Sequence, residues 1–320
     1  MSLKRAGHPI HMTPRPRRLP RLPYVLTLLL LAGTLLLAAC GGGAATTTNE
    51  GGQQGSGTSA PSGSTAQGGA NGEPVQGGSI HVAIPAEPPT LDWTSSTATA
   101  TRLVSWHVFE QIVGLAKDYS VRPMLAESYD MSDDGLVYTF HLRPNVRFHN
   151  GETMTADDAV ASVKRWGEIS GGGKETFSHV QEVTAVDEST VQIKLKEPFG
   201  PLLTNMADPK QSLVVIPASI AAAAGAQPLS NEQLIGTGPY QFVSWSPGQK
   251  IILKRFDDYT PRTEDWGGLT GSKVAYLDEI TFELVKDPAV RRNGLQTGQY
   301  DFATDLTTDS TTSVTGRPAY

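Results

Sequence analysis

The residue types that most often carry catalytic chemistry are present in this chain, but they are not spaced as a reaction would require. Five histidines fall between positions 81 and 179, and none is three or four residues from another, so the spacing predicts no metal site. Three acidic pairs, Asp133-Asp134, Asp157-Asp158 and Asp257-Asp258, could form acid/base dyads. Their surroundings are more typical of a turn, a helix N-terminus and a second turn. We therefore expect no enzyme activity and no cofactor.

The sequence also gives only a weak indication of a glycine-rich nucleotide-binding loop. Gly236-Thr237-Gly238 matches half of a dinucleotide-binding loop, but Pro239 follows where a helix-opening amide would contact phosphate. The same tripeptide suits a tight entry into a strand, with positive φ at the two glycines and with Pro239 fixing the turn. We interpret it as structural.

The only cysteine, Cys40, follows a segment with the features of a secretory signal peptide. A basic stretch ends at Arg21, and residues 24–39 are uncharged and rich in leucine. Such a run spans about 24 Å as a helix, less than the roughly 30 Å of a hydrocarbon core. Leu37-Ala38-Ala39-Cys40 resembles a bacterial lipobox, which implies cleavage before Cys40 and lipid on its thiol. A permanent N-terminal membrane helix is the alternative.

Charge and composition divide the rest of the chain. Without residues 1–39 the chain has 20 basic and 32 acidic residues, and this negative charge makes a nucleic-acid partner a poor expectation. Residues 41–78 are mostly Gly, Ser, Thr, Ala, Gln and Asn, which predicts a disordered tether with an r.m.s. span of about 35 Å. The tether either lets the body reach a membrane neighbour or is a passive spacer.

From residue 79 the sequence has the patterns of a folded α/β domain. Asp133-Asp134-Gly135 is typical of a turn before a strand, and Thr155 to Asp158 resembles a helix capping box. Gly171-Gly172-Gly173 predicts a break after that helix. Hydrophobic spacing predicts strands at 79–84, 136–142, 183–186, 190–195, 240–245, 250–256 and 280–285, and helices at 101–113, 155–166 and from 287 to about 294 or 298. The interleaved elements predict a mixed α/β sheet protein.

Eight short motifs follow one another between residues 77 and 301. They are Gly-Gly-Ser-Ile at 77–80, Pro-Pro-Thr-Leu-Asp at 88–92, Val-Phe-Glu-Gln-Ile-Val at 108–113, Pro-Met-Leu-Ala-Glu-Ser-Tyr at 123–129, Tyr-Thr-Phe-His-Leu-Arg-Pro-Asn-Val-Arg-Phe-His-Asn-Gly-Glu at 138–152, Thr-Ala-Asp-Asp-Ala-Val at 155–160, Gly-Thr-Gly-Pro-Tyr at 236–240 and Leu-Gln-Thr-Gly-Gln-Tyr-Asp at 295–301. In this order they resemble the family 5 extracellular solute-binding proteins, the oligopeptide, dipeptide and nickel receptors of ABC importers.

The resemblance implies a type II periplasmic-binding-protein-like fold whose two lobes close on a ligand. It also implies that the partners are a peptide or other small solute, an ABC permease with its ATPase, and the membrane through the lipid on Cys40. In this family the segment after the first strand can contact ligand, which here corresponds to Thr97, Ala98 and Thr99. An exposed threonine-rich loop is the alternative for these three residues. The motifs at 143–151 and 236–240 are expected to be scaffold.

The resemblance also gives an expected domain plan. Residues 1–39 are the signal peptide, 40–78 the lipidated cysteine and tether, 79–304 a first lobe with a mixed β-sheet, and 305–320 the truncated start of a second lobe that is otherwise absent. We expect an extracytoplasmic, membrane-anchored binding protein of an ABC importer. The alternative is a surface lipoprotein that acts as a sensor or interaction module without transport. The identity of the solute is not encoded in a readable motif.

Overall fold

The computed structural model describes residues 74–307. The predicted signal peptide at 1–39, Cys40, nearly all of the tether at 40–78 and most of the segment at 305–320 lie outside the described residues. Within 74–307, no helix combines the length and the apolar character that crossing a bilayer requires.

Two main sheets and one short hairpin form the strand framework. The five-stranded sheet has the order β11-β1-β10-β9-β8, the four-stranded sheet has the order β4-β5-β7-β6, and β2 pairs with β3. The strands are β1 (Ser79–Ile84), β2 (Val113–Leu115), β3 (Val121–Pro123), β4 (Ala126–Met131), β5 (Val137–Leu142), β6 (Val180–Asp187), β7 (Thr190–Leu195), β8 (Tyr240–Ser246), β9 (Lys250–Arg255), β10 (Glu279–Leu284) and β11 (Phe302–Ala303).

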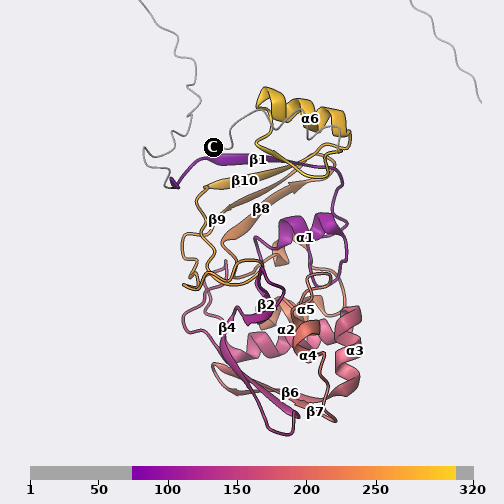
Figure 1. Cartoon of the computed structure of the whole chain (residues 1–320), viewed down its shortest axis with the longest axis vertical. Helices are drawn as coiled ribbons and strands as arrows, with labels where there is room; N and C mark the ends of the chain where they lie inside the picture. The colour runs from indigo at the N-terminus through magenta and orange to yellow at the C-terminus, as the bar shows by residue number, and fades with distance from the viewer. Residues whose placement is uncertain (1–73, 308–320) are drawn as a thin grey trace, which may run out of the picture. The chain divides into compact units, whose positions relative to one another are not determined.

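The helices lie between these strands in the sequence and differ greatly in length (Figure 1). They are α1 (Thr99–Ser105), α2 (Ala156–Ile169), α3 (Gly171–His179), α4 (Leu202–Met206), α5 (Ala218–Ala224) and α6 (Pro288–Thr297), with a 3-10 turn η1 at Asn231–Gln233. Figure 1 shows α6 beside β1 and β10, whereas α2 to α5 gather near the four-stranded sheet.

The five-stranded sheet is mixed, as the sequence predicted. Strand β1 pairs in parallel with β10 on one side and with β11 on the other, whereas β10, β9 and β8 pair antiparallel. Parallel pairing requires a long connection, and the chain between β1 and β10 builds the second sheet and most of the helices. One core lies against this sheet and includes Val82, Trp93, Leu253 and Phe282.

The four-stranded sheet is antiparallel and packs against α2. Tyr138, Phe140 and Leu142 alternate with less buried residues along β5, which is the predicted pattern for a strand with one buried face. A second core joins this face to Trp166 of α2. Among the described residues, the predicted hairpins β6–β7 and β8–β9, the strand β10 and the helix α6 are confirmed.

The predicted helix at 101–113 is wrong over its second half. Helix α1 ends at Ser105, and residues 113–115 form β2. The apolar residues of this segment are buried on two sides, because Val108 and Phe109 enter one core while Ile112 and Val113 enter the other. In an extended segment that lies between two cores, the apolar residues therefore have a spacing that resembles the spacing in an amphipathic helix.

The predicted break at Gly171–Gly173 is also displaced. Ser170 ends α2 and caps α3, and the three glycines form the first turn of α3. A Cβ atom on Gly173 would lie 2.1 Å from the carbonyl oxygen of Trp166. The glycines thus do not form a loop. They allow two consecutive helices to approach each other closely.

Candidate ligand-binding cleft

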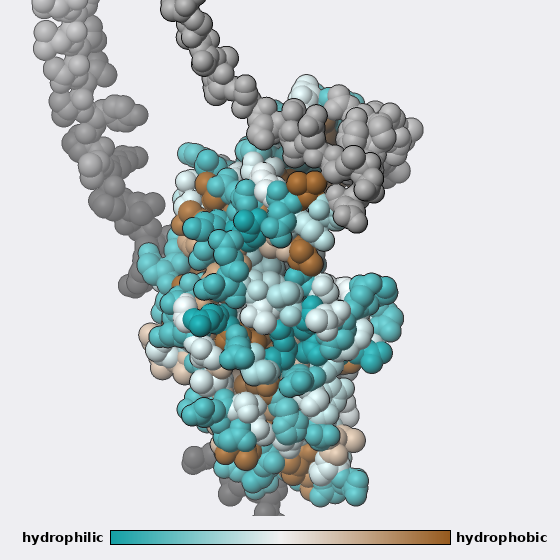
Figure 2. Space-filling view, turned by 90° about the vertical axis from the view of Figure 1, so that its left-hand side faces the viewer, coloured by the Kyte–Doolittle hydropathy of each residue, from teal (hydrophilic) through white to brown (hydrophobic). Residues whose placement is uncertain are grey.

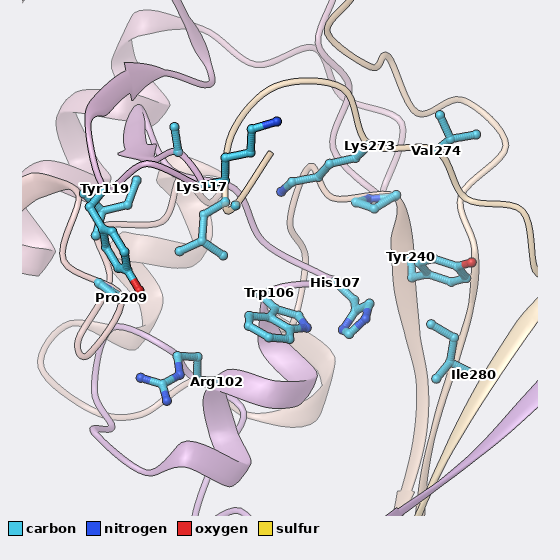
Figure 3. Close-up of a pocket in the computed structure, with 15 residues that line it drawn as sticks. Arg102, Trp106, His107, Lys117, Tyr119, Pro209, Tyr240, Lys273, Val274 and Ile280 are labelled. Atoms are coloured by element: carbon cyan, nitrogen blue, oxygen red, sulfur yellow. The ribbon is translucent and has the colours of Figure 1, made fainter. Parts of the chain in front are cut away.

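An open cleft of about 960 Å³ lies beside α1. Its walls come from α1 and the residues directly after it, the β2–β3 hairpin, the start of β8, and the loop that precedes β10. Figure 3 shows Arg102 and Trp106 projecting from α1, with Tyr240 and Ile280 on the side of the five-stranded sheet. The volume is in the range of pockets that hold small molecules.

Three cationic side chains line the cleft, namely Arg102, Lys117 and Lys273. No acidic residue of the described chain is part of the lining. In residues 74–307, no hydrogen bond or ion pair engages the side chain of Arg102 or Lys117. The cleft therefore has an excess of positive charge.

Lys273 differs from the other two cations because a buried carboxylate lies behind it. Its Nζ atom is 3.6 Å from Oε1 of Glu110, whose side chain is almost fully buried. Tyr259 donates a hydrogen bond of 2.8 Å to the same oxygen, and Thr237 donates one of 3.0 Å to Oε2. Glu110 thus offsets part of the charge of Lys273 and keeps the Lys273 ammonium group close to the wall of the cleft.

Aromatic rings make up much of the remaining wall. The imidazole of His107 packs edge-on against Trp106, Tyr240 and Phe282, with ring centroids 5.7 to 6.1 Å apart. Burial lowers the pKa of His107 from 6.5 to about 4, and the nearby charge of Lys273 acts in the same direction. His107 is therefore neutral at pH 7 and adds an aromatic surface, not a further charge.

Tyr119 stands at the tip of the β2–β3 hairpin and lines the cleft. It is 83% exposed and has a positive φ of 63°. A bulky L-residue rarely adopts this left-handed conformation. The turn therefore presents a large aromatic ring to solvent at the edge of the cleft, and Figure 3 shows this ring beside Pro209.

The predicted ligand contacts Thr97, Ala98 and Thr99 lie at the beginning of α1. Ala98 is the N-cap residue and Thr99 is the first helical residue. None of the three lines the cleft, whereas Arg102, one turn further along, does. Their role in binding stays a prediction. Sequence reasoning missed Arg102, although its position on the same short helix offered a signal.

The motif at 236–240 was expected to be scaffold. Pro239 and Tyr240 instead line the cleft, whereas Gly236-Thr237-Gly238 does not and packs against the backbone, although not for the predicted reason. Neither glycine has a positive φ, so that part of the prediction is wrong. A Cβ atom on Gly236 would lie 2.1 Å from the carbonyl oxygen of Val108. His149 also contacts this segment, accepting at Nδ1 from the amide of Gly236 and donating from Nε2 to the carbonyl of Gly238. Close backbone packing therefore explains the glycines.

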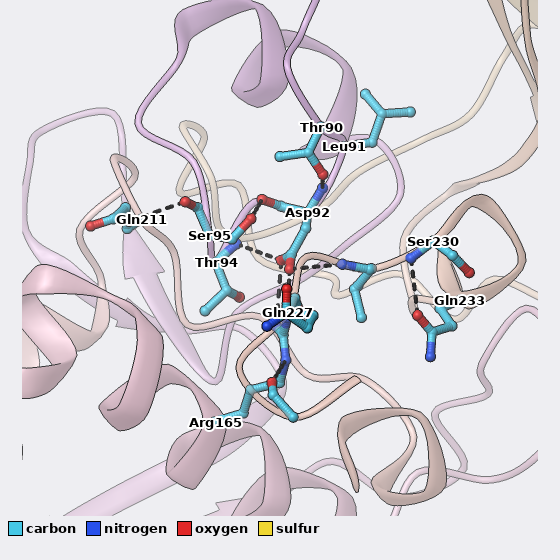
Figure 4. A network of polar contacts seen from close by, with 12 residues as sticks. Thr90, Leu91, Asp92, Thr94, Ser95, Arg165, Gln211, Gln227, Ser230 and Gln233 are labelled. Atoms are coloured by element: carbon cyan, nitrogen blue, oxygen red, sulfur yellow. Dashed lines mark hydrogen bonds and ion pairs between the residues drawn. The ribbon is translucent and has the colours of Figure 1, made fainter. Parts of the chain in front are cut away.

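A buried ion pair fixes the segment that leads into α1 (Figure 4). Asp92 and Arg165 are both almost fully buried and form a salt bridge. Asp92 also accepts hydrogen bonds from the amides of Thr94 and Leu229, at 3.1 and 3.2 Å. Arg165 donates to the carbonyl of Gln227 at 2.8 Å. The charges are thus compensated within the protein and have a structural role.

The described residues offer no competing metal site, and one face of the surface has no continuous apolar patch. Across residues 74–307, no three His, Cys, Asp or Glu side chains are grouped as a metal ion would require. On the face in Figure 2, hydrophilic residues predominate and apolar ones occur in small separate groups. The cleft is therefore the strongest candidate site on the described part of the chain.

Comparison with known proteins supports the assignment of the chain and its fold to one class. The family model described as bacterial extracellular solute-binding proteins, family 5 Middle, matches residues 120–320. A probable peptide ABC transporter periplasmic-binding protein, y4tO of Sinorhizobium fredii, is 30% identical over 219 residues. The glutathione-binding protein GsiB of Salmonella typhimurium is 31% identical over 228 residues. These matches cover 66% and 70% of this chain.

Solved structures agree with these matches. The periplasmic binding protein AgaA from A. tumefaciens R10, in complex with agropinic acid, has a TM-score of 0.63 at 29% identity and is matched by 75% of this chain. The oligopeptide-binding protein AppA of Bacillus subtilis, in complex with a nonapeptide, has a TM-score of 0.64 at 26% identity and is matched by 76% of this chain. The fold is that of a periplasmic binding protein.

The chain belongs to family 5 of the bacterial extracellular solute-binding proteins. It spans about 40% of the length of the curated relatives that it matches, and 46% and 47% of AgaA and AppA. Proteins of this family are transport components that bind solutes.

Proposed function

We propose that this chain is a solute-binding component of an ABC importer and that it contacts a peptide or a related small solute in the cleft beside α1. The observation that carries the proposal is a cleft with an aromatic and cationic lining in a member of a solute-binding family. The relatives named for peptide and glutathione binding support the solute class. Delivery of the solute to a permease and its ATPase is part of the proposal.

The cleft can be tested by a peptide titration that is read from its own residues. Trp106 lines the cleft, whereas Trp245 donates its indole N–H to Glu87 and lies outside the lining. We expect millimolar di- to pentapeptides to shift the indole N–H signal of Trp106 in the nitrogen-15-labelled chain and to leave that of Trp245 in place. Trp106→Ala should weaken saturable binding about tenfold, and Trp245→Ala, the matched control, should not. Equal effects of the two substitutions, or no shift of cleft signals with any peptide, would contradict the proposal.

We further propose an extracytoplasmic location with the lipid on Cys40 as the membrane anchor. The sequence Leu37-Ala38-Ala39-Cys40 after an apolar run supports this proposal. Several acyl chains, at about 0.8 kcal/mol for each buried methylene, hold a protein stably on a membrane. Cells that make the wild-type chain should yield it in the detergent phase of a phase-separation assay. Cys40→Ser should move it to the aqueous phase, and an unchanged partition would refute the anchor.

A further inference from the structure

We propose that the cleft selects solutes that carry an anionic headgroup, a carboxylate or a phosphate ester, with Arg102 as its principal anchor. The inference rests on the proposed binding function and specifies the chemical class of its ligand. It is independent of the predicted contacts at Thr97–Thr99.

The first observation is the uncompensated charge of the cleft. Arg102, Lys117 and Lys273 line it, and no acidic side chain of residues 74–307 does. Glu110 offsets Lys273 from behind, so Arg102 and Lys117 supply the charge that remains available. A concave wall of one sign concentrates ligands of the opposite sign, because the low-dielectric protein focuses the field into the opening.

The second observation sets Arg102 apart from the buried arginines of the described chain. Arg165, Arg262 and Arg291 each donate several hydrogen bonds to carbonyl or carboxylate oxygens. Arg102 is only partly exposed, yet no protein acceptor in residues 74–307 engages its guanidinium. A guanidinium offers a planar set of donors that matches carboxylate and phosphate oxygens. Its unused donors therefore fit an anionic ligand.

The third observation concerns the rest of the ligand. Trp106 follows Arg102 by four residues and lines the same cleft. Because α1 ends at Ser105, Trp106 is its C-cap residue and stays close to the turn that carries Arg102. Leu115, Leu269 and Ile280 add apolar surface. An anion with an apolar or planar body would satisfy both parts of this lining.

The test uses three small probes that share an aromatic body and differ in charge. They are N-acetyl-phenylalanine, its neutral amide, and phenyl phosphate, each titrated into the labelled chain at low salt while the cleft signals are followed. We expect at least one of the two anions to bind about tenfold more tightly than the amide, which corresponds to about 1.4 kcal/mol. The ratio of the affinities of the two anions shows whether the cleft prefers a carboxylate or a phosphate ester. Added salt should reduce the preference.

Substitutions then assign the preference to Arg102. Arg102→Gln should remove the difference between anion and amide, and Arg102→Lys should retain part of it because the charge remains but the planar donor set is lost. Arg292→Gln is the matched control: it removes the same charge from α6, where the guanidinium hydrogen-bonds only to Asn293 among the described residues.

The possible failures can be distinguished. If the amide binds the cleft as tightly as both anions, or if the preference survives Arg102→Gln, the anion proposal is overturned while the binding function stands. If no probe and no peptide shifts the cleft signals, both proposals are overturned. A preference that Arg292→Gln removes equally would reflect net charge and would also overturn the role of Arg102.

Discussion

Arg165 and Arg102 illustrate two different environments for the same side chain. Arg165 of α2 lies at a closed junction, where Asp92 and several backbone carbonyls satisfy its guanidinium. Arg102 of α1 lies in an open cleft, where no acceptor from residues 74–307 reaches it. The two segments are linked, because Asp92 precedes α1 by only a few residues.

The difference separates structural charge from charge that is available to a ligand. A buried cation with all its partners inside the protein stabilises one arrangement of the backbone and has no donor left over. A cation in a cleft without partners retains its hydrogen-bonding capacity for a ligand. A charged residue in a binding protein is therefore best interpreted from its partners, and its burial alone does not distinguish the two cases.

The largest expected effect is at the closed junction. Arg165→Met leaves the buried carboxylate of Asp92 without its counter-charge, and loss of one partner of a buried pair costs about 3–5 kcal/mol. The free energy of unfolding, measured by urea denaturation, should fall by that amount. A loss of less than about 1 kcal/mol would show that the charge of Arg165 is no more structural than that of Arg102.

A double variant sharpens the same comparison. Asp92→Asn combined with Arg165→Met removes both charges, and neutral residues in place of a buried pair are often tolerated. The double variant should therefore be more stable than Arg165→Met alone. Arg102→Met in the cleft is the matched control, and it should change the free energy of unfolding little because it breaks no described hydrogen bond.

An intermediate effect should follow from pH, through two neutral histidines. Burial lowers the pKa values of His107 and His149 from 6.5 to about 4. Because the folded state disfavours their protonation, their contribution to stability is complete above pH 6.5 and is lost as the pH falls toward 4. Shifts of this size would correspond to at most about 3–4 kcal/mol of unfolding free energy for each residue, and the partial exposure of both side chains reduces this value.

The imidazole proton signals provide the measurement. The titration midpoints of His107 and His149 in the folded chain should lie near pH 4. His107→Gln should make the free energy of unfolding less dependent on pH between 6.5 and 4.5. A midpoint near 6.5 for His107 would place an additional positive charge in the cleft at mildly acidic pH and would change its electrostatic description.

The smallest expected effect is at the edge of the cleft. Tyr119 adopts a left-handed backbone conformation that costs an ordinary L-residue about 1–2 kcal/mol, and asparagine tolerates this conformation better. Tyr119→Asn should raise the free energy of unfolding by about 1 kcal/mol. Tyr276→Asn is the control at an exposed tyrosine without positive φ, and it should have no comparable effect. An unchanged or lower stability of Tyr119→Asn would show that the turn is not strained.

The sequence predicted those elements whose signals are local. Alternation of apolar residues identified β5, and Pro288 with Gly298 bounded α6 closely. The extended segment after α1 was predicted as helix because its apolar residues are buried on two sides and so lack the alternation of a strand with one buried face. Gly236 was recognised as structural, but its reason, contact with the backbone near Val108, depends on the tertiary fold.

The cleft could not be predicted for the same reason. Arg102, Lys117 and Lys273 come from an α-helix, a hairpin and a loop far along the chain, and no local motif joins them. Thr97–Thr99 were selected by resemblance, and they lie one turn before the first charged residue of the lining. The resemblance thus selected residues near the cleft proposed here, and their contact with a ligand stays a prediction, whereas the lining itself could be identified only from the fold.

The close packing of Gly236 and Gly238 against residues 107 and 108 also bears on the order of folding. These contacts join segments more than a hundred residues apart, and His149 adds a third segment from between them. Closing such long loops is slow, because the chain loses entropy before the contacts form. We expect pulse-labelling hydrogen exchange to show the amide of Gly238 protected after those of the β6–β7 hairpin, so that the wall of the cleft becomes complete only when these distant segments have met.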